Sequence, residues 1–93
     1  MPTEIYQNFE WDSEKSIANL RKHNIDFYTA CTIFSGIVVP VKEVTTENDE
    51  IRYLCIGELN GIFFSVVYTF RGERKRLISV RRAREDEKRF YSS

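Results

Sequence analysis

The sequence lacks the short patterns that identify most metal-dependent and phosphate-loop enzymes. It contains no HExxH, no CxxC and no glycine-rich phosphate loop, and its one histidine, His23, is accompanied by only two cysteines, Cys31 and Cys55. A metal site is therefore not expected. Because both cysteines lie in apolar stretches, we expect them to be buried free thiols. An enzyme built from this chain would act through positioned acid–base and cationic side chains.

Long apolar runs are also missing. No stretch approaches the roughly 20 residues that a membrane-spanning helix needs, and Met1–Glu4 lacks the cationic start of a signal peptide. We therefore expect a cytoplasmic protein without a membrane partner. The chain has 93 residues, of which 42% are hydrophobic and 30% charged, so one globular domain over residues 1–93 is expected.

Each part of the chain is short of one kind of charge: cations are few before residue 71, and anions are few after it. The whole protein is formally neutral, with 14 Lys and Arg against 14 Asp and Glu. Residues 71–93 hold nine of the cations and only four of the anions, so this segment carries +5 and residues 1–70 carry −5. A basic surface on a neutral protein suits a polyanion such as RNA, or an acidic partner protein.

The N-terminal third predicts two short helices. In the first, Ile17 and Leu20 fall on one face at helical spacing, which predicts that they point into the core. We expect the first helix to be capped by Asp12 or Ser13 and to end near Asn24. The second should be capped by Asp26 and end at Gly36.

From Ile37 on, the pattern changes to that of strands and a final helix. Pro40 places the first strand at a sheet edge, since proline donates no ladder hydrogen bond, and Asn60-Gly61 permits a two-residue hairpin. We predict an α+β fold of order ααββββα, with two N-terminal helices, a four-stranded mainly antiparallel sheet and a C-terminal helix. The expected elements are strands over 37–41, 51–59, 62–70 and 74–80, and a helix over 82–91.

Lys22 and His23 close the first predicted helix and are candidates for chemistry. Histidine is the side chain whose unperturbed charge changes nearest neutral pH, so it could activate a ribose 2′-hydroxyl or protonate a leaving oxygen. Lysine could hold a phosphate as a point charge. The alternative is that both are simply favourable cations at the C-terminus of a helix.

Two groups of arginines are candidate phosphate ligands. Strand alternation places Arg74 and Arg76 on one face, where they could grip successive phosphates, or else form a solvated strand edge. Arg81 and Arg82 lie where a strand gives way to a helix, whose N–H groups would add to an anion site. The acids at 85–87 are expected to favour the helix dipole, and not to bind Mg²⁺.

A longer pattern extends over nearly the whole chain, from about Phe9 to Tyr91. This pattern resembles the BrnT family of toxins, from which the chain departs at Asn24, Val80 and Arg84, the last standing where the family often has a helix-capping threonine. The matching parts are Phe9-Glu10-Trp11-Asp12-x-x-Lys15, Asn19-Leu20-x-Lys22-His23, Phe27-x-x-Ala30-x-x-x-Phe34, Arg52-x-x-x-Ile56-Gly57, Val66-Val67-Tyr68-Thr69-x-Arg71-Gly72, and Arg76 to Ala83 with Glu87 and Tyr91.

The resemblance implies a RelE-like fold and a metal-independent ribonuclease that arrests translation, with no cofactor. It also implies a BrnA-type ribbon-helix-helix antitoxin that neutralises the toxin and through which the complex binds operator DNA and represses its own operon. Together with the charge pattern, it leaves acid and base unassigned and names as catalytic candidates Lys22, His23, Arg71 and Arg81, and as RNA-binding candidates Arg74, Arg76 and Arg82.

A second hypothesis is a binding module, in which a toxin homologue acts only in complex with its antitoxin. The charge pattern fits both hypotheses, because an antitoxin would cover the same cations that RNA would touch. RNA cleavage in the presence of EDTA separates them. In either case we expect an exposed lysine of the N-terminal part, Lys42, to lie away from the basic face.

Overall fold

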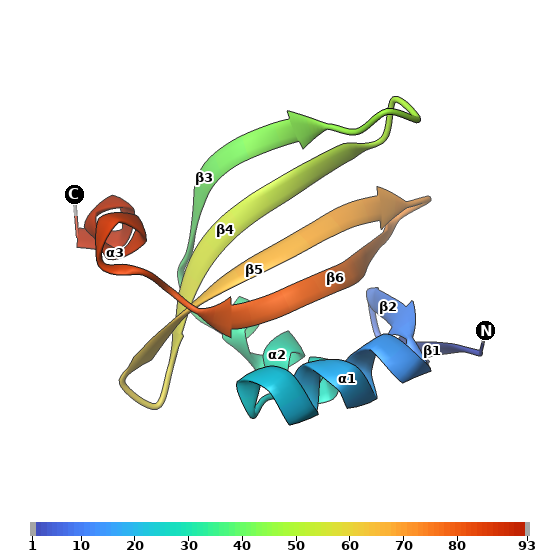
Figure 1. Cartoon of the computed structure of the whole chain (residues 1–93), viewed down its shortest axis with the longest axis horizontal. Helices are drawn as coiled ribbons and strands as arrows, with labels where there is room; N and C mark the ends of the chain where they lie inside the picture. The colour runs from blue at the N-terminus through green and yellow to red at the C-terminus, as the bar shows by residue number, and fades with distance from the viewer. Residues whose placement is uncertain (1, 93) are drawn as a thin grey trace.

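A twisted sheet with helices on both faces organises the chain (Figure 1). The structure is a computed structural model that describes residues 2–92. In these residues the sheet has six strands in the order β1-β2-β6-β5-β4-β3. The elements along the chain are β1 (Thr3–Tyr6), β2 (Phe9–Asp12), α1 (Ser13–His23), α2 (Phe27–Cys31), the 3₁₀ helix η1 (Thr32–Ser35), β3 (Val38–Thr45), β4 (Ile51–Leu59), β5 (Ile62–Arg71), β6 (Arg74–Arg82) and α3 (Glu85–Ser92).

The predicted four-stranded sheet and the order ααββββα are wrong. The chain opens with the antiparallel pair β1 and β2, and β2 then runs parallel to β6, with Phe9 opposite Lys75. The expected RelE-like arrangement is thereby corrected to a mixed six-stranded sheet. Its strands β1 and β2 precede α1 in the chain, and β3 to β6 lie between η1 and α3. All four residues of β2 are buried. Its residues alternate between apolar and acidic, but a run of four is at the lower limit for recognising a strand, and its partner β6 lies more than 60 positions along the chain.

Helix α1 turns its polar residues inward, against expectation. Ser16 and Asn19 are buried, whereas Ile17 and Leu20 are 52% and 45% exposed, so the predicted inward face is wrong. The reason is local hydrogen bonding. The Ser16 hydroxyl accepts the Phe27 N–H at 2.9 Å and so holds the start of α2 against α1.

The predicted caps of the helices are mostly confirmed. The Asp12 carboxylate accepts the Glu14 N–H at 2.9 Å, and the Asp26 carboxylate accepts the Thr29 N–H at 2.8 Å. Asn24 ends α1 with a left-handed φ of 60°. Gly36 does not adopt the expected left-handed conformation, because its φ is −103° and the chain passes from η1 straight into β3.

The predictions for the strands hold where local signals set them. Asn60 and Gly61 have φ values of 53° and 81°, as a hairpin between β4 and β5 requires. Strand β3, which contains Pro40, lies at the sheet edge, and its register shifts between Pro40 and Lys42. The last helix begins later than predicted, at Glu85, because residues 81–82 continue β6.

The core lies between the sheet and the layer of α1, α2 and η1. Its innermost side chains, such as Phe27, Ile33 and Val66, are 0% exposed. Cys31 and Cys55 are buried free thiols, as predicted, and burial raises the pKa of each to about 12. Helix α3 packs against β3 and β4 and lies apart from α1 and α2 (Figure 1). No helix within residues 2–92 has the length and apolar character to cross a membrane.

Candidate functional site

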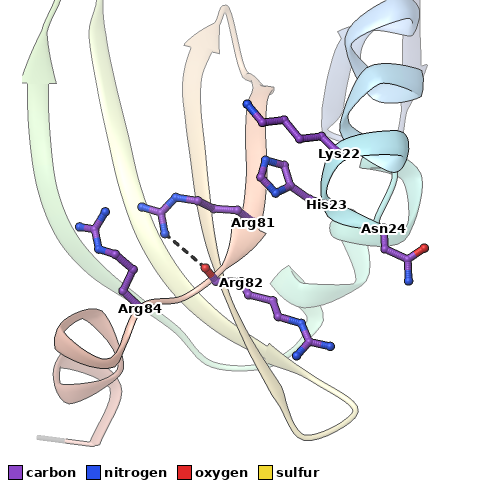
Figure 2. Close-up of a pocket in the computed structure, with 6 residues that line it drawn as sticks. All are labelled: Lys22, His23, Asn24, Arg81, Arg82 and Arg84. Atoms are coloured by element: carbon purple, nitrogen blue, oxygen red, sulfur yellow. Dashed lines mark hydrogen bonds between the residues drawn. The ribbon is translucent and has the colours of Figure 1, made fainter.

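An open cleft of about 470 Å³ lies where the end of α1 meets the end of β6. Four residues that the sequence singled out, Lys22, His23, Arg81 and Arg82, line it together. Figure 2 shows Lys22 and His23 extending from α1 toward β6, while the Arg81 side chain points away from α1, toward Arg84. Residues 59 positions apart along the chain are thus brought to one cationic surface.

Asn19 fixes α1 to β6 beside this cleft. Strand β2 pairs with β6 only at Lys75 and Arg76, which leaves the later part of β6 without a strand on that side. There the Asn19 side chain replaces a strand, since its Nδ2 donates to the Val80 carbonyl at 2.9 Å and its Oδ1 accepts the Val80 N–H at 3.2 Å. Nδ2 also donates to the Ile25 carbonyl at 2.8 Å. One amide therefore holds α1 against β6 at Val80, the neighbour of Arg81 in the chain.

The end of α1 presents its cations to the cleft. Arg21, Lys22 and His23 occupy the last helical turn, and the left-handed Asn24 donates its N–H to the Leu20 carbonyl. The free carbonyls of a helix end favour cations. Lys22 is exposed, whereas His23 is half-buried. His23 is therefore held against the protein while still open to a ligand in the cleft.

Arg81 is bound tightly by Glu87 of α3. Its Nη1 and Nη2 donate to the two carboxylate oxygens of Glu87 at 2.7 and 2.8 Å. Glu87 is 2% exposed and also accepts the Ser65 hydroxyl at 2.7 Å and the Arg84 N–H at 2.9 Å. The Arg81 guanidinium is the largest cause that lowers the pKa of Glu87 to about 2, and the same pair raises the pKa of Arg81. The charge of Arg81 is thus already paired with a carboxylate inside the protein.

The other predicted cations lie elsewhere. Arg71 and Arg74 flank the turn between β5 and β6, seven residues along β6 from Arg81 and hence roughly 20 Å away. Arg71 lies 3.6 Å from Glu50. Arg76 donates to Glu10 at 2.6 Å and is only 20% exposed in its side chain. The structure therefore does not bring Arg71, Arg74 or Arg76 to the cleft that holds His23.

Sequence reasoning missed three residues that build the cleft. Asn19 bonds α1 to β6, Glu87 binds the guanidinium of Arg81, and Arg84 lines the cleft beside them. The sequence predicts Glu87 only as one of the acids at a helix start, whereas in the structure its side chain is buried and its neighbours Glu85 and Asp86 are exposed. Helical spacing from Ala83 gives no guide to Glu87, because Ala83 lies before the start of α3; the available signal is the family resemblance, which includes Glu87.

Fold and cleft together define a small mixed α and β protein that gathers several cations and its one histidine around an open cleft. Among the described residues, no group of three or more His, Cys, Asp or Glu is placed to hold a metal ion. The model of one protein family, described as the ribonuclease toxin BrnT of type II toxin–antitoxin systems, matches residues 11–87. The chain therefore belongs to the BrnT family, whose members are toxins that act on RNA and are paired with an antitoxin. A comparison with curated proteins finds no match.

Proposed function

We propose that this protein cleaves single-stranded RNA in the cleft between α1 and β6, through the ribose 2′-hydroxyl and without a metal ion. The observation that carries the proposal is the meeting of Lys22 and His23 with Arg81 and Arg82 in one cleft. A proton-transfer group and several phosphate-binding cations are the parts that such a reaction needs. The family membership supports RNA as the substrate.

The proposed reaction transfers the phosphoryl group within the RNA chain. The 2′-hydroxyl loses its proton, its oxygen attacks the adjacent phosphorus, the bond from phosphorus to the 5′-oxygen breaks, and that oxygen gains a proton. His23 makes one of the two proton transfers. Lys22 and Arg82 bind the non-bridging oxygens, and Arg81 adds a guanidinium whose position Glu87 fixes. The products are a 2′,3′-cyclic phosphate and a free 5′-hydroxyl.

The charge of the cleft supports independence from metal. Its lining contains Lys22, Arg81, Arg82 and Arg84, which repel a divalent cation. The nearest buried carboxylate, Glu87, already accepts hydrogen bonds from Arg81, Ser65 and Arg84. The charge that stabilises the developing oxyanion is therefore supplied by side chains of the protein.

The same surface is proposed to be the target of neutralisation. We expect a ribbon-helix-helix antitoxin of BrnA type to place an acidic segment across the cleft and so exclude RNA. In that complex the antitoxin contacts operator DNA, and the toxin acts as co-repressor of its own operon. The free toxin would arrest translation by cleaving RNA. The family's antitoxin partnership and the cationic cleft support this account.

Cleavage of an RNA oligonucleotide by the purified protein in excess EDTA tests the proposal. We expect chain cuts that leave 2′,3′-cyclic phosphate ends, detected by mass spectrometry of the fragments. A requirement for Mg²⁺, or products that carry 3′-hydroxyls, would contradict the mechanism. Tight RNA binding without any cut would instead support the hypothesis of a non-catalytic binding module.

A further inference from the structure

A second concavity lies on the sheet face that carries α3. Its volume is about 300 Å³, and it combines apolar and cationic side chains. Leu54 and Val67 belong to its apolar lining, and Lys42 and Arg52 to its cationic lining. Leu54 is buried and Val67 half-buried, so both belong to the sheet surface rather than to a flexible rim. We call this concavity the sheet-face groove.

The sheet-face groove adjoins the cleft. Arg81 and Arg84 line both concavities. Glu87 holds both guanidinium groups in place, with Arg84 Nη2 lying 3.4 Å from its Oε2 in addition to the paired bonds to Arg81. An extended ligand that leaves the cleft past Arg81 therefore meets the exposed guanidinium of Arg84 and then the groove.

Lys42 distinguishes the groove chemically. It is exposed and has no carboxylate partner within residues 2–92, whereas Arg52 is paired with Glu50 at 3.0 Å. An unpaired ammonium suits a phosphate, and an apolar floor suits the face of a base. An RNA strand repeats phosphate and base at every residue, so it can occupy the cleft and the groove together.

We propose that the sheet-face groove is a second nucleotide subsite of the same RNA site. It takes the base of a nucleotide that flanks the scissile linkage, and Lys42 binds the phosphate of that nucleotide. This inference rests on the proposed function of the cleft, and it extends the site across the sheet. It also corrects the expectation that Lys42 lies away from the basic face, because Lys42 shares the groove with Arg81 and Arg84.

Binding of uncleavable RNA of two lengths tests the subsite. The probes are 2′-O-methyl oligonucleotides of mixed sequence, a dinucleotide that fills only the cleft and an octanucleotide that reaches the groove. We expect Lys42→Ala to weaken binding of the octanucleotide several-fold, to reduce its salt slope by about 0.7, and to leave the dinucleotide unchanged. Lys15→Ala, an exposed lysine outside both concavities, is the matched control.

A second pair of variants tests the apolar lining. Val44 is 48% exposed and lines the groove, and Ile37 is 72% exposed outside it. Val44→Asp should weaken octanucleotide binding at least as much as Lys42→Ala does, and Ile37→Asp should not. Both are surface changes, so equal melting temperatures verify the fold.

Two results would overturn the subsite. One is an octanucleotide affinity that neither Lys42→Ala nor Val44→Asp changes. The other is a loss of affinity for the cognate antitoxin with RNA binding intact, which would assign the groove to a protein partner. Because the probes cannot be cut, these results are independent of catalysis. A protein that binds the octanucleotide through the groove but cuts no RNA would refute the proposed function and leave the subsite standing.

Discussion

At the scale of single residues, one carboxylate does most to shape the cleft. Glu87 accepts four hydrogen bonds, two from Arg81, one from the Ser65 hydroxyl and one from the Arg84 N–H. A buried charge is tolerated only when its partners satisfy it this fully. The arrangement fixes Arg81 but balances its charge, which leaves Lys22 and Arg82 as the cleft cations most available to a phosphate.

The pH dependence of stability measures this carboxylate. The folded pKa of Glu87 is lowered from 4.5 to about 2, so its contribution is fully present above about pH 4.5 and is lost as the pH falls toward 2. The free energy of unfolding of wild type should exceed that of Glu87→Gln by roughly 3 kcal/mol at pH 7. The difference should shrink steadily below pH 4.5 in urea titrations.

Asp86→Asn is the matched control for that series. Asp86 is on the same helix, but its side chain is 67% exposed and 3.3 Å from Arg84. Exposed pairs of this kind contribute only about 0–1 kcal/mol, so this variant should stay close to wild type at each pH. A Glu87→Gln difference that is constant from pH 7 to pH 2 would show that the charge of Glu87 does not stabilise the fold.

At the scale of elements, helix α1 is held in place by a buried amide, Asn19, while its Leu20 is exposed. Asn19 gives α1 its position by bonding Val80 and Ile25, and Ile17 and Leu20 are left in solvent. Polar residues on the inner face of a helix are worth burying only when each of their atoms has a partner, and within the described residues every buried side-chain nitrogen and oxygen has one.

Hydrophobicity alone suggests that Asn19→Leu stabilises the protein and that Ile17→Lys destabilises it. We expect instead that Asn19→Leu is the destabilising change. Asn19→Leu leaves the N–H and carbonyl of Val80 and the carbonyl of Ile25 without this partner, and each such loss costs about 1–3 kcal/mol. Ile17→Lys at an exposed position should change stability by less than about 0.5 kcal/mol. Melting temperatures of both variants check this. A larger loss of stability in Ile17→Lys would show that the Ile17 side chain belongs to the core.

Local signals explain which elements the sequence predicts. The caps Asp12 and Asp26 and the turn Asn60-Gly61 act within a few residues, and the structure has them where expected. The pairing of β2 with β6 and the bond from Asn19 to Val80 join residues more than 60 positions apart, and no local pattern encodes them. The meeting of Lys22 and His23 with Arg81 and Arg82 follows from those distant contacts, although the residues themselves were singled out.

At the scale of the whole molecule, the basic C-terminal segment is divided between two ends of β6. Arg81, Arg82 and Arg84 face the cleft, while Arg71 and Arg74 lie at the distant turn. The charge asymmetry of the sequence therefore predicts a polyanion-binding surface but not its extent. Arg71, Arg74 and Arg76 lie outside the cleft, and the catalytic role of Arg71 and the RNA contacts of Arg74 and Arg76 stay predictions.

Charge reversal at Arg82 should weaken two partners at once. Arg82→Glu removes an exposed cation from the cleft, so RNA affinity should fall and the salt slope should drop by about 0.7 for the lost phosphate contact. The cognate antitoxin should lose affinity in parallel, measured by calorimetry. Lys15→Glu is the control, and Lys42 is unsuitable because it lines the sheet-face groove. Unchanged antitoxin affinity would show that neutralisation uses a different surface.

The proposed active site depends most on His23, the group that transfers a proton in the cleft. The direct measurement is the rate of RNA cleavage in EDTA by wild type, His23→Gln and Lys15→Gln at equal protein concentration and verified melting temperature. A general acid or base contributes about 10²–10⁴-fold, so His23→Gln should be at least about 100-fold slower, with RNA affinity nearly unchanged and Lys15→Gln at the wild-type rate. A folded His23→Gln protein that cuts RNA as fast as wild type would contradict the proposed active site.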